Sequence, residues 1–178
     1  MTAADPFLDL VRALHHHRVR FVLIGVSGVN YYASRGSLLF TTADHDLFLP
    51  LDTPNTLGAW HAAESRGLEL SAGVEPLDVP HDETVARAVV DRRALVTASN
   101  ETGLTVDFAL VMAGFDFETV WQERRTFVAD GTQLPVARLA HIIKSKATAG
   151  RQKHRLFLAT YAEGLEALLK RDTETAAE

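Results

Sequence analysis

The chain has 178 residues, of which 47% are hydrophobic and 23% charged, a balance typical of one globular domain with a sizeable core. It contains no cysteine, which excludes disulfide bonds and a thiolate metal site. The net charge of −5 argues against a large non-specific nucleic-acid surface, and neither a signal peptide nor a bilayer-spanning apolar run is apparent, so we expect a cytoplasmic protein without a membrane partner.

The N-terminal half predicts helices that alternate with short strands. Asp5 before Pro6 predicts a helix start, and apolar residues recur at helical spacing as far as a solvated run of three histidines at 15–17. The next elements are expected in this order: a buried strand in 20–28 that ends in a glycine turn, a helix over 29–36 closed by Gly36, a strand from about 44 to 49 stopped by Pro50, and a helix over 52–67.

The C-terminal half predicts strands joined by hairpin turns, followed by helices. The expected elements are a strand over 68–72, a loop over 74–82, a helix over 82–93, strands in 94–99 and 104–111 joined by "NETG", a helix over 115–125, a hairpin at Asp130-Gly131, and helices in 136–150 and 151–171. This order predicts an α+β fold with a mixed, partly antiparallel sheet flanked by helices and a helical C-terminal segment. We expect a core over 1–135 and C-terminal helices over 136–172 in the same domain.

Three aspartates interrupt apolar strands and form the main candidate site. Asp44 and Asp46 share one face of their strand because they are two residues apart, and Asp107 is the lone carboxylate of a second apolar strand. If the strands are neighbours, the three acids converge into an all-oxygen ligand set suited to Mg²⁺ or Mn²⁺. The alternative is that Asp44 ends a turn, Asp46 faces water and Asp107 lies on a solvated sheet face. His45 points away from both neighbouring acids, which favours a packing role.

Two further segments have the chemistry of a phosphate site. The turn "GVSG" offers backbone N–H groups at a helix start, with Gly25, Ser27 and Gly28 as candidates, although glycine is also common there for packing. The segment 144–155 gathers cations around Gly150 in an otherwise acidic chain, which is typical of either a phosphate clamp or a solvated basic face. Its cations are Lys144, Lys146, Arg151, Lys153 and Arg155.

These motifs together resemble the nucleotidyltransferase superfamily, whose members share the catalytic fold of DNA polymerase β. Segments 21–36 and 41–50 are similar to the strand–turn–helix and paired-aspartate strand of that family, and 104–115 resembles its third-carboxylate strand. Segment 135–158 resembles the lysine and Ala-Gly-Arg helix of AbiEii-like and small uncharacterised bacterial nucleotidyltransferases. The chain departs from the family pattern in having Val26 after Gly25, and His154 in place of an acid.

The resemblance implies roles for the candidate residues. Catalysis and metal binding fall to Asp44, Asp46 and Asp107, the last of which also helps to deprotonate the acceptor hydroxyl. Phosphate binding falls to Gly25, Ser27, Gly28, Lys146, Arg151 and Lys153.

The resemblance further implies an enzyme that uses Mg²⁺ or Mn²⁺ to transfer a nucleoside monophosphate from a nucleoside triphosphate such as ATP. The acceptor hydroxyl belongs to an RNA end such as that of tRNA, to a protein, or to a small molecule. Two other hypotheses stay open. One is a non-catalytic antitoxin or regulatory protein that keeps the fold and binds a toxin or antitoxin partner. The other is a metal-dependent phosphohydrolase that uses water as the acceptor.

Overall fold

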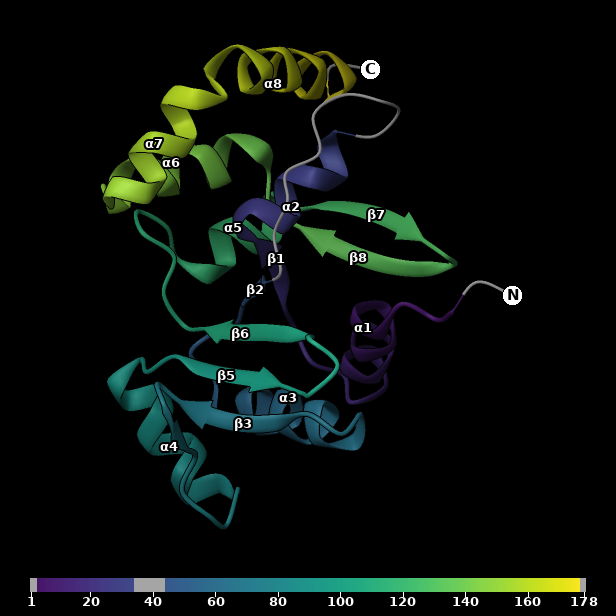
Figure 1. Ribbon diagram of the computed structural model, residues 1–178, viewed down its shortest axis with the longest axis vertical. Coiled ribbons are helices and arrows are strands. Elements are labelled where there is room, and N and C mark those ends of the chain that lie inside the picture. The colour runs from purple at the N-terminus through teal and green to yellow at the C-terminus, as the bar shows by residue number, and fades with distance from the viewer. Residues whose placement is uncertain (1–2, 34–43, 177–178) are drawn as a thin grey trace.

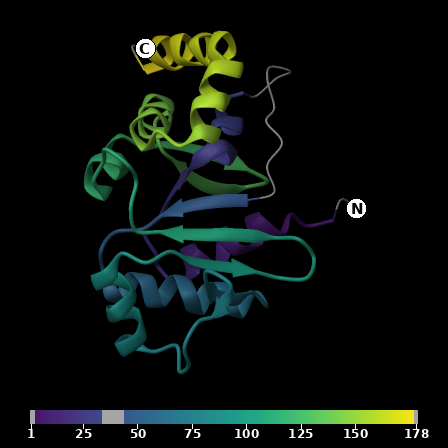
Figure 2. The same ribbon diagram turned by 60° about the vertical axis from the view of Figure 1, so that its left-hand side comes forward.

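The computed structural model describes residues 3–33 and 44–176, which fold around one mixed sheet (Figures 1 and 2). Within these residues the sheet has eight strands in the order β4-β3-β5-β6-β2-β1-β8-β7. The strands are β1 (Val22–Ile24), β2 (Asp44–Phe48), β3 (Glu69–Ala72), β4 (Glu75–Pro76), β5 (Val96–Ser99), β6 (Thr105–Ala109), β7 (Arg125–Ala129) and β8 (Thr132–Val136). The pairs β2–β6 and β1–β8 are parallel and the others antiparallel, so the predicted α+β class with a mixed sheet is confirmed.

Helices surround the sheet. They are α1 (Pro6–His16), α2 (Gly25–Tyr32), α3 (Thr53–Ser65), α4 (Glu83–Arg92), α5 (Phe117–Glu123), α6 (Leu139–Ala149), α7 (Gln152–Thr160) and α8 (Ala162–Ala176). Figure 1 shows α7 and α8 at one end of the molecule and α4 at the other, with the sheet between them. None of the helices in the described part of the chain is long and apolar enough to cross a membrane.

Most predicted helix starts and turns are present as expected. The carboxylates of Asp5 and Asp52 accept hydrogen bonds from the first turns of α1 and α3, and Pro6 begins the first of these helices. Asp130 and Gly131 both have positive φ, at 48° and 72°, which is the two-residue turn that joins β7 to β8. These turns determine where the strands pair.

Two predicted boundaries were wrong. The helix expected over 29–36 begins at Gly25, because the chain turns from β1 into α2 at this residue, whose φ is +77°. The loop expected over 74–82 contains the two-residue strand β4, which pairs with β3. The predicted helix stop at Gly36 lies outside the described residues.

The sheet has one apolar and one polar face in its central strands. Along β6 the side chains of Val106 and Phe108 are buried, whereas Thr105 and Asp107 on the opposite face are only half-buried. β5 alternates in the same way, with Val96 buried and the Thr97 face half-buried. The core therefore lies against the apolar face, and the candidate carboxylates project from the polar one.

The C-terminal helices pack against the core, in line with a single unit. Leu139 and Ile142 of α6 and Leu165 of α8 are buried among the core residues. Arg125 at the start of β7 donates a 3.1 Å hydrogen bond to the Asp172 carboxylate of α8. These contacts hold the predicted basic segment next to the sheet.

Candidate functional site

Asp46 and Asp107 are direct neighbours across two parallel strands. The register of β2 and β6 pairs Asp46 with Asp107 and Asp44 with Thr105, so the side chains lie on one face in two adjacent rows. Burial raises the pKa of Asp46, and the charge of the Asp107 carboxylate raises it further, as expected for two acids on adjacent strands. Two of the three predicted carboxylates therefore meet, as expected if the two strands are neighbours.

Thr97 on the next strand holds Asp107. The register of β5 and β6 places Thr97 opposite Asp107, and its Oγ1 donates a 2.6 Å hydrogen bond to Asp107 Oδ1. Sequence reasoning missed this residue. A four-residue turn at "NETG" would have paired Thr97 with Val106, whereas the connection in the structure has five residues, 100–104, and this extra residue brings Thr97 opposite Asp107.

A cavity of about 380 Å³ opens beside this pair of acids. The predicted site residues that line it are Gly25, Asp46, Asp107, Lys146, Arg151 and Lys153. The acids come from β2 and β6, the glycine from the start of α2, and the cations from α6 and α7. One cavity thus brings together parts of the chain that are more than 100 residues apart.

Gly25 is required by its contact with Asp46. Its φ of +77° is rare for residues with a side chain, and a Cβ atom built on it would collide with Asp46 Oδ2. The absence of a side chain lets the Asp46 carboxylate lie directly against the first residue of α2. A negative charge at this helix start is favourable because the backbone N–H groups there lack helical partners.

Ser27 and Gly28 lie below the turn and do not line the cavity. Ser27 is buried, and its hydroxyl has no hydrogen-bond partner within the described ranges. A Cβ on Gly28 would lie 3.1 Å from Cδ1 of Ile142 on α6, so this glycine allows close helix packing. Gly28 is therefore a glycine needed for packing, which is the alternative role considered for the glycines of this turn.

The electrostatics of the cavity are shaped by burial and by opposite charges. Burial, together with the neighbouring charges of Asp107 and Asp44, raises the pKa of Asp46 to about 6, although Lys146 lowers it. Burial lowers the pKa of Lys146, Asp46 raises it, and Lys153 lowers it further. The site therefore pairs a carboxyl that binds protons more tightly than usual with an amine that binds them less tightly.

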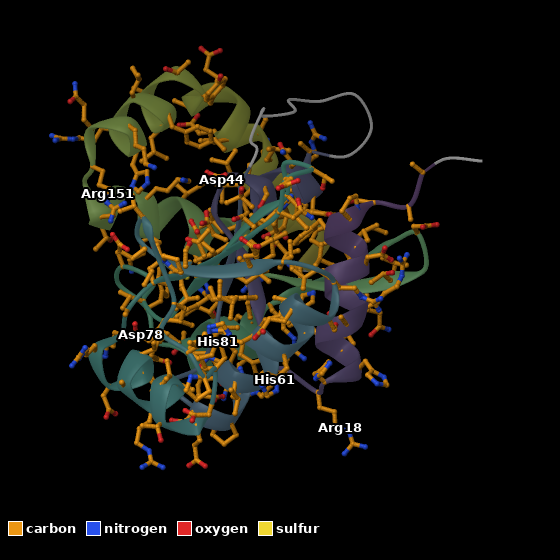
Figure 3. All side chains as sticks on the ribbon, turned by 60° about the horizontal axis from the view of Figure 1, so that its bottom comes forward. Arg18, Asp44, His61, Asp78, His81 and Arg151 are labelled. Carbon is orange, nitrogen blue, oxygen red and sulfur yellow. The ribbon has the colours of Figure 1, made fainter. Side chains whose placement is uncertain are left out.

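Asp44 does not line the cavity. It is exposed at the start of β2, and Figure 3 labels it near the beginning of that strand. Among the described side chains, no group of three or more His, Cys, Asp or Glu residues is placed to hold a metal ion. The expected convergence of three carboxylates is thus found for two of them.

His45 packs on the opposite side of the strand, as predicted. Its ring stacks on Phe7 of α1 at a centroid distance of 3.8 Å and an interplanar angle of 4°. Burial lowers its pKa, against the opposing effects of Asp5 and Asp44. The residue joins α1 to the sheet.

The cavity also contains charged residues that were not predicted as site residues. His154 lines it, and burial together with Lys146, Lys153 and Arg151 lowers its pKa. Arg93, which follows α4, lines it as well. By contrast, the predicted cations Lys144 and Arg155 are exposed and lie outside the lining. No protein-family model and no curated protein sequence matches the chain.

Proposed function

We propose that this protein is a metal-dependent nucleotidyltransferase, which transfers a nucleoside monophosphate from a nucleoside triphosphate to an acceptor hydroxyl. The observation that carries the proposal is the in-register pair Asp46 and Asp107 beside a cavity lined by four cations and by the start of α2. Carboxylates that bind cations and cations that bind phosphate, side by side, are the parts that phosphoryl transfer requires.

The acids fit a hard divalent cation. Both are oxygen donors, and the pKa of Asp46 is raised by burial and by the charge of Asp107, which a cation between the two carboxylates would offset. Mg²⁺ or Mn²⁺ held by Asp46 and Asp107 would supply positive charge to the reacting phosphates and acidify the acceptor hydroxyl.

The remaining steps fall to side chains and backbone. The acceptor oxygen forms a bond to the α-phosphorus, and the bond from that phosphorus to the bridging oxygen breaks, so pyrophosphate leaves with the electron pair. The Asp107 carboxylate takes the hydroxyl proton and passes it to water. Lys146, Arg151 and Lys153 neutralise the triphosphate and then the pyrophosphate. Gly25 leaves room for the Asp46 carboxylate at the start of α2.

A second candidate, a non-catalytic binding protein with the same fold, is favoured by one observation. Asp44 lies outside the cavity, so the ligand set there has two carboxylates instead of three. Such a protein would bind a partner chain through this fold and transfer nothing.

A labelling assay separates the candidates. The protein is incubated with each α-labelled nucleoside triphosphate, Mg²⁺ or Mn²⁺, and separate RNA, protein and small-molecule fractions. We expect label in one acceptor fraction, lost in Asp46→Asn and retained in Asp78→Asn, whose exposed carboxylate lies away from Asp44 and Arg151 in Figure 3. Label that survives Asp46→Asn, or its absence in every fraction, contradicts the proposal.

A further inference from the structure

The cavity has two chemically different walls. Lys146, Arg151 and Lys153 form the first, which we call the basic wall. Arg93, Leu95 and Val111 lie in the second, which we call the far wall. Leu95 and Val111 are 50% and 55% exposed, although both are large and apolar. The far wall therefore offers one cation next to an uncovered apolar surface.

The topology puts the basic wall and the Arg93 and Leu95 part of the far wall on opposite sides of the acid pair, and Val111 follows β6 between them. In the sheet order β5-β6-β2-β1, Arg93 and Leu95 precede β5, on one side of β6 and β2. The basic wall belongs to α6 and α7, and α6 packs on α2, which follows β1 on the other side. Figures 1 and 2 both show α6 and α7 separated from α4 by the central strands.

The geometry of phosphoryl transfer then indicates which substrate lies at which wall. The attacking oxygen and the leaving oxygen lie roughly in line through the α-phosphorus. A triphosphate bound to the basic wall sends its pyrophosphate toward Lys146, Arg151 and Lys153. The acceptor hydroxyl must therefore arrive from the side of the far wall.

From this arrangement we infer that Arg93 binds an anionic group of the acceptor, while Leu95 and Val111 contact the apolar surface beside the reacting hydroxyl. This rests on the proposed function and adds the chemical class of the acceptor: a small hydroxyl compound with a phosphate or carboxylate group. A guanidinium is suited to either anion because its planar N–H groups match paired oxygens.

The charges along the rest of this sheet face favour a small acceptor over a nucleic acid. The register places Glu69, Ser99, Thr105 and Asp44 in one row next to the acid pair, and Glu101 follows in the turn after β5. All three acids in this region are exposed. A single anion is accommodated at Arg93, but a chain of phosphates that extended along β5 would meet repulsion.

The backbone at Arg93 provides a test that leaves the fold intact. Arg93 has a φ of 51° and ends α4, with Ala94 N–H bonded to Val89 O and Arg93 N–H to Val90 O. Glycine is the usual residue at this position, so Arg93→Gly removes the side chain and relieves the backbone.

Arg18 is a matched control. It ends α1 with a φ of 55° and the same pair of bonds, from Val19 N–H to Leu14 O and from Arg18 N–H to His15 O. Figure 3 shows it at the opposite end of the molecule from Arg151. Arg18→Gly therefore makes the same change in the same backbone motif away from the cavity.

The experiment measures transfer, triphosphate binding and stability for both variants. Small molecules from a cell extract are separated by anion exchange, and each fraction is offered as acceptor beside total RNA and total protein. We expect label in the retained small-molecule fraction only. Arg93→Gly should lower kcat/KM for that acceptor by about 10- to 100-fold, with an unchanged Kd for a methylene-bridged triphosphate analogue and an unchanged or higher Tm. Arg18→Gly should leave transfer unchanged.

Other outcomes overturn the inference. Label in RNA, in protein or in the unretained fraction contradicts the acceptor class. Equal transfer by Arg93→Gly and the parent, with transfer still dependent on Asp46, rejects the role of Arg93 and leaves the proposed function standing. Weaker binding of the triphosphate analogue by Arg93→Gly assigns the residue to the nucleotide instead. No transfer by the parent rejects both the inference and the proposed function.

Discussion

The carboxylate of Asp46 occupies the space that a side chain on residue 25 would need. The strand that carries the acid and the helix that begins at the glycine are thereby held in contact, with no room for a larger residue between them. This contact places the acid against the first residue of α2 and makes Gly25 part of the site.

Gly25→Ala should therefore cost both stability and function. A methyl group here adds backbone strain to a collision with Asp46, and we expect a loss of about 1–3 kcal/mol in the free energy of unfolding. The control is Gly67→Ala, where φ is +76° and no atom lies within 4 Å of the added Cβ. Urea denaturation measures the free energy of unfolding of both variants. Gly67→Ala reports the backbone strain alone, and Gly25→Ala reports strain plus the collision. An equal loss of stability in both would contradict the role of the Asp46 contact.

Thr97→Val should weaken metal binding at Asp107. The substitution keeps the shape of the side chain but removes the donor of the 2.6 Å hydrogen bond that orients the carboxylate. We expect Mn²⁺ affinity, measured by electron paramagnetic resonance, to fall about 10-fold, as is usual when a metal ligand loses the hydrogen bond that orients it. Thr97→Ser should restore it, and Thr105→Val, on the same face in the next row, should have little effect. Normal affinity in Thr97→Val would refute the prediction.

Stability of the metal-free protein should depend on the protonation of Asp46. Its pKa is raised from 3.8 to about 6 in the folded state, so the folded protein binds this proton more tightly than the unfolded chain. The resulting stabilisation is complete below pH 3.8 and is lost as the pH rises through 6. Relative to Asp46→Asn, the parent should lose on the order of 1 kcal/mol between pH 5 and pH 7, the last part of a stabilisation that is about 3 kcal/mol in full.

Urea denaturation of both proteins at the two pH values measures this difference. The asparagine variant serves as the reference because both proteins contain the same half-buried histidines, whose pKa values burial lowers. Identical pH dependence in the two proteins would show that Asp46 keeps an ordinary pKa.

Lys146→Met should weaken triphosphate binding. Lys146 lines the cavity beside Asp46, and its charge is partly shielded from water, which strengthens its interaction with phosphate. We expect the Kd of the methylene-bridged analogue to rise about 10- to 100-fold. Lys144→Met is the control, since Lys144 is exposed on the same helix outside the cavity lining. A similar effect of both variants would indicate a general loss of basic charge.

The elements and the acid pair could be predicted from the sequence because local signals determine them. Alternation along β5 and β6, the Asp130-Gly131 turn and the helix caps at Asp5 and Asp52 each depend on neighbouring residues. The convergence of Asp46 with Asp107 needed one further assumption, that β2 and β6 are neighbours, and the structure confirms it.

The rest of the site depends on tertiary packing that no local pattern contains. Val111 and Arg93 reach the cavity because the segments after β6 and α4 meet beside the acids. Gly28 is matched to Ile142, which is more than 100 residues away on α6. Asp44 shares a strand face with Asp46, as the spacing indicated, yet one row along the strand is enough to leave it outside the cavity.

The register between β2 and β6 also bears on how such a site persists during evolution. A slip of one residue would turn Asp107 into the core and Phe108 outward, so burial of Leu47, Val106 and Phe108 penalises any misalignment of the acids. Many apolar side chains could fill those three positions. A lineage can therefore exchange most of its core residues, drifting far from its ancestors in sequence, while hydrophobic selection alone keeps the two carboxylates side by side.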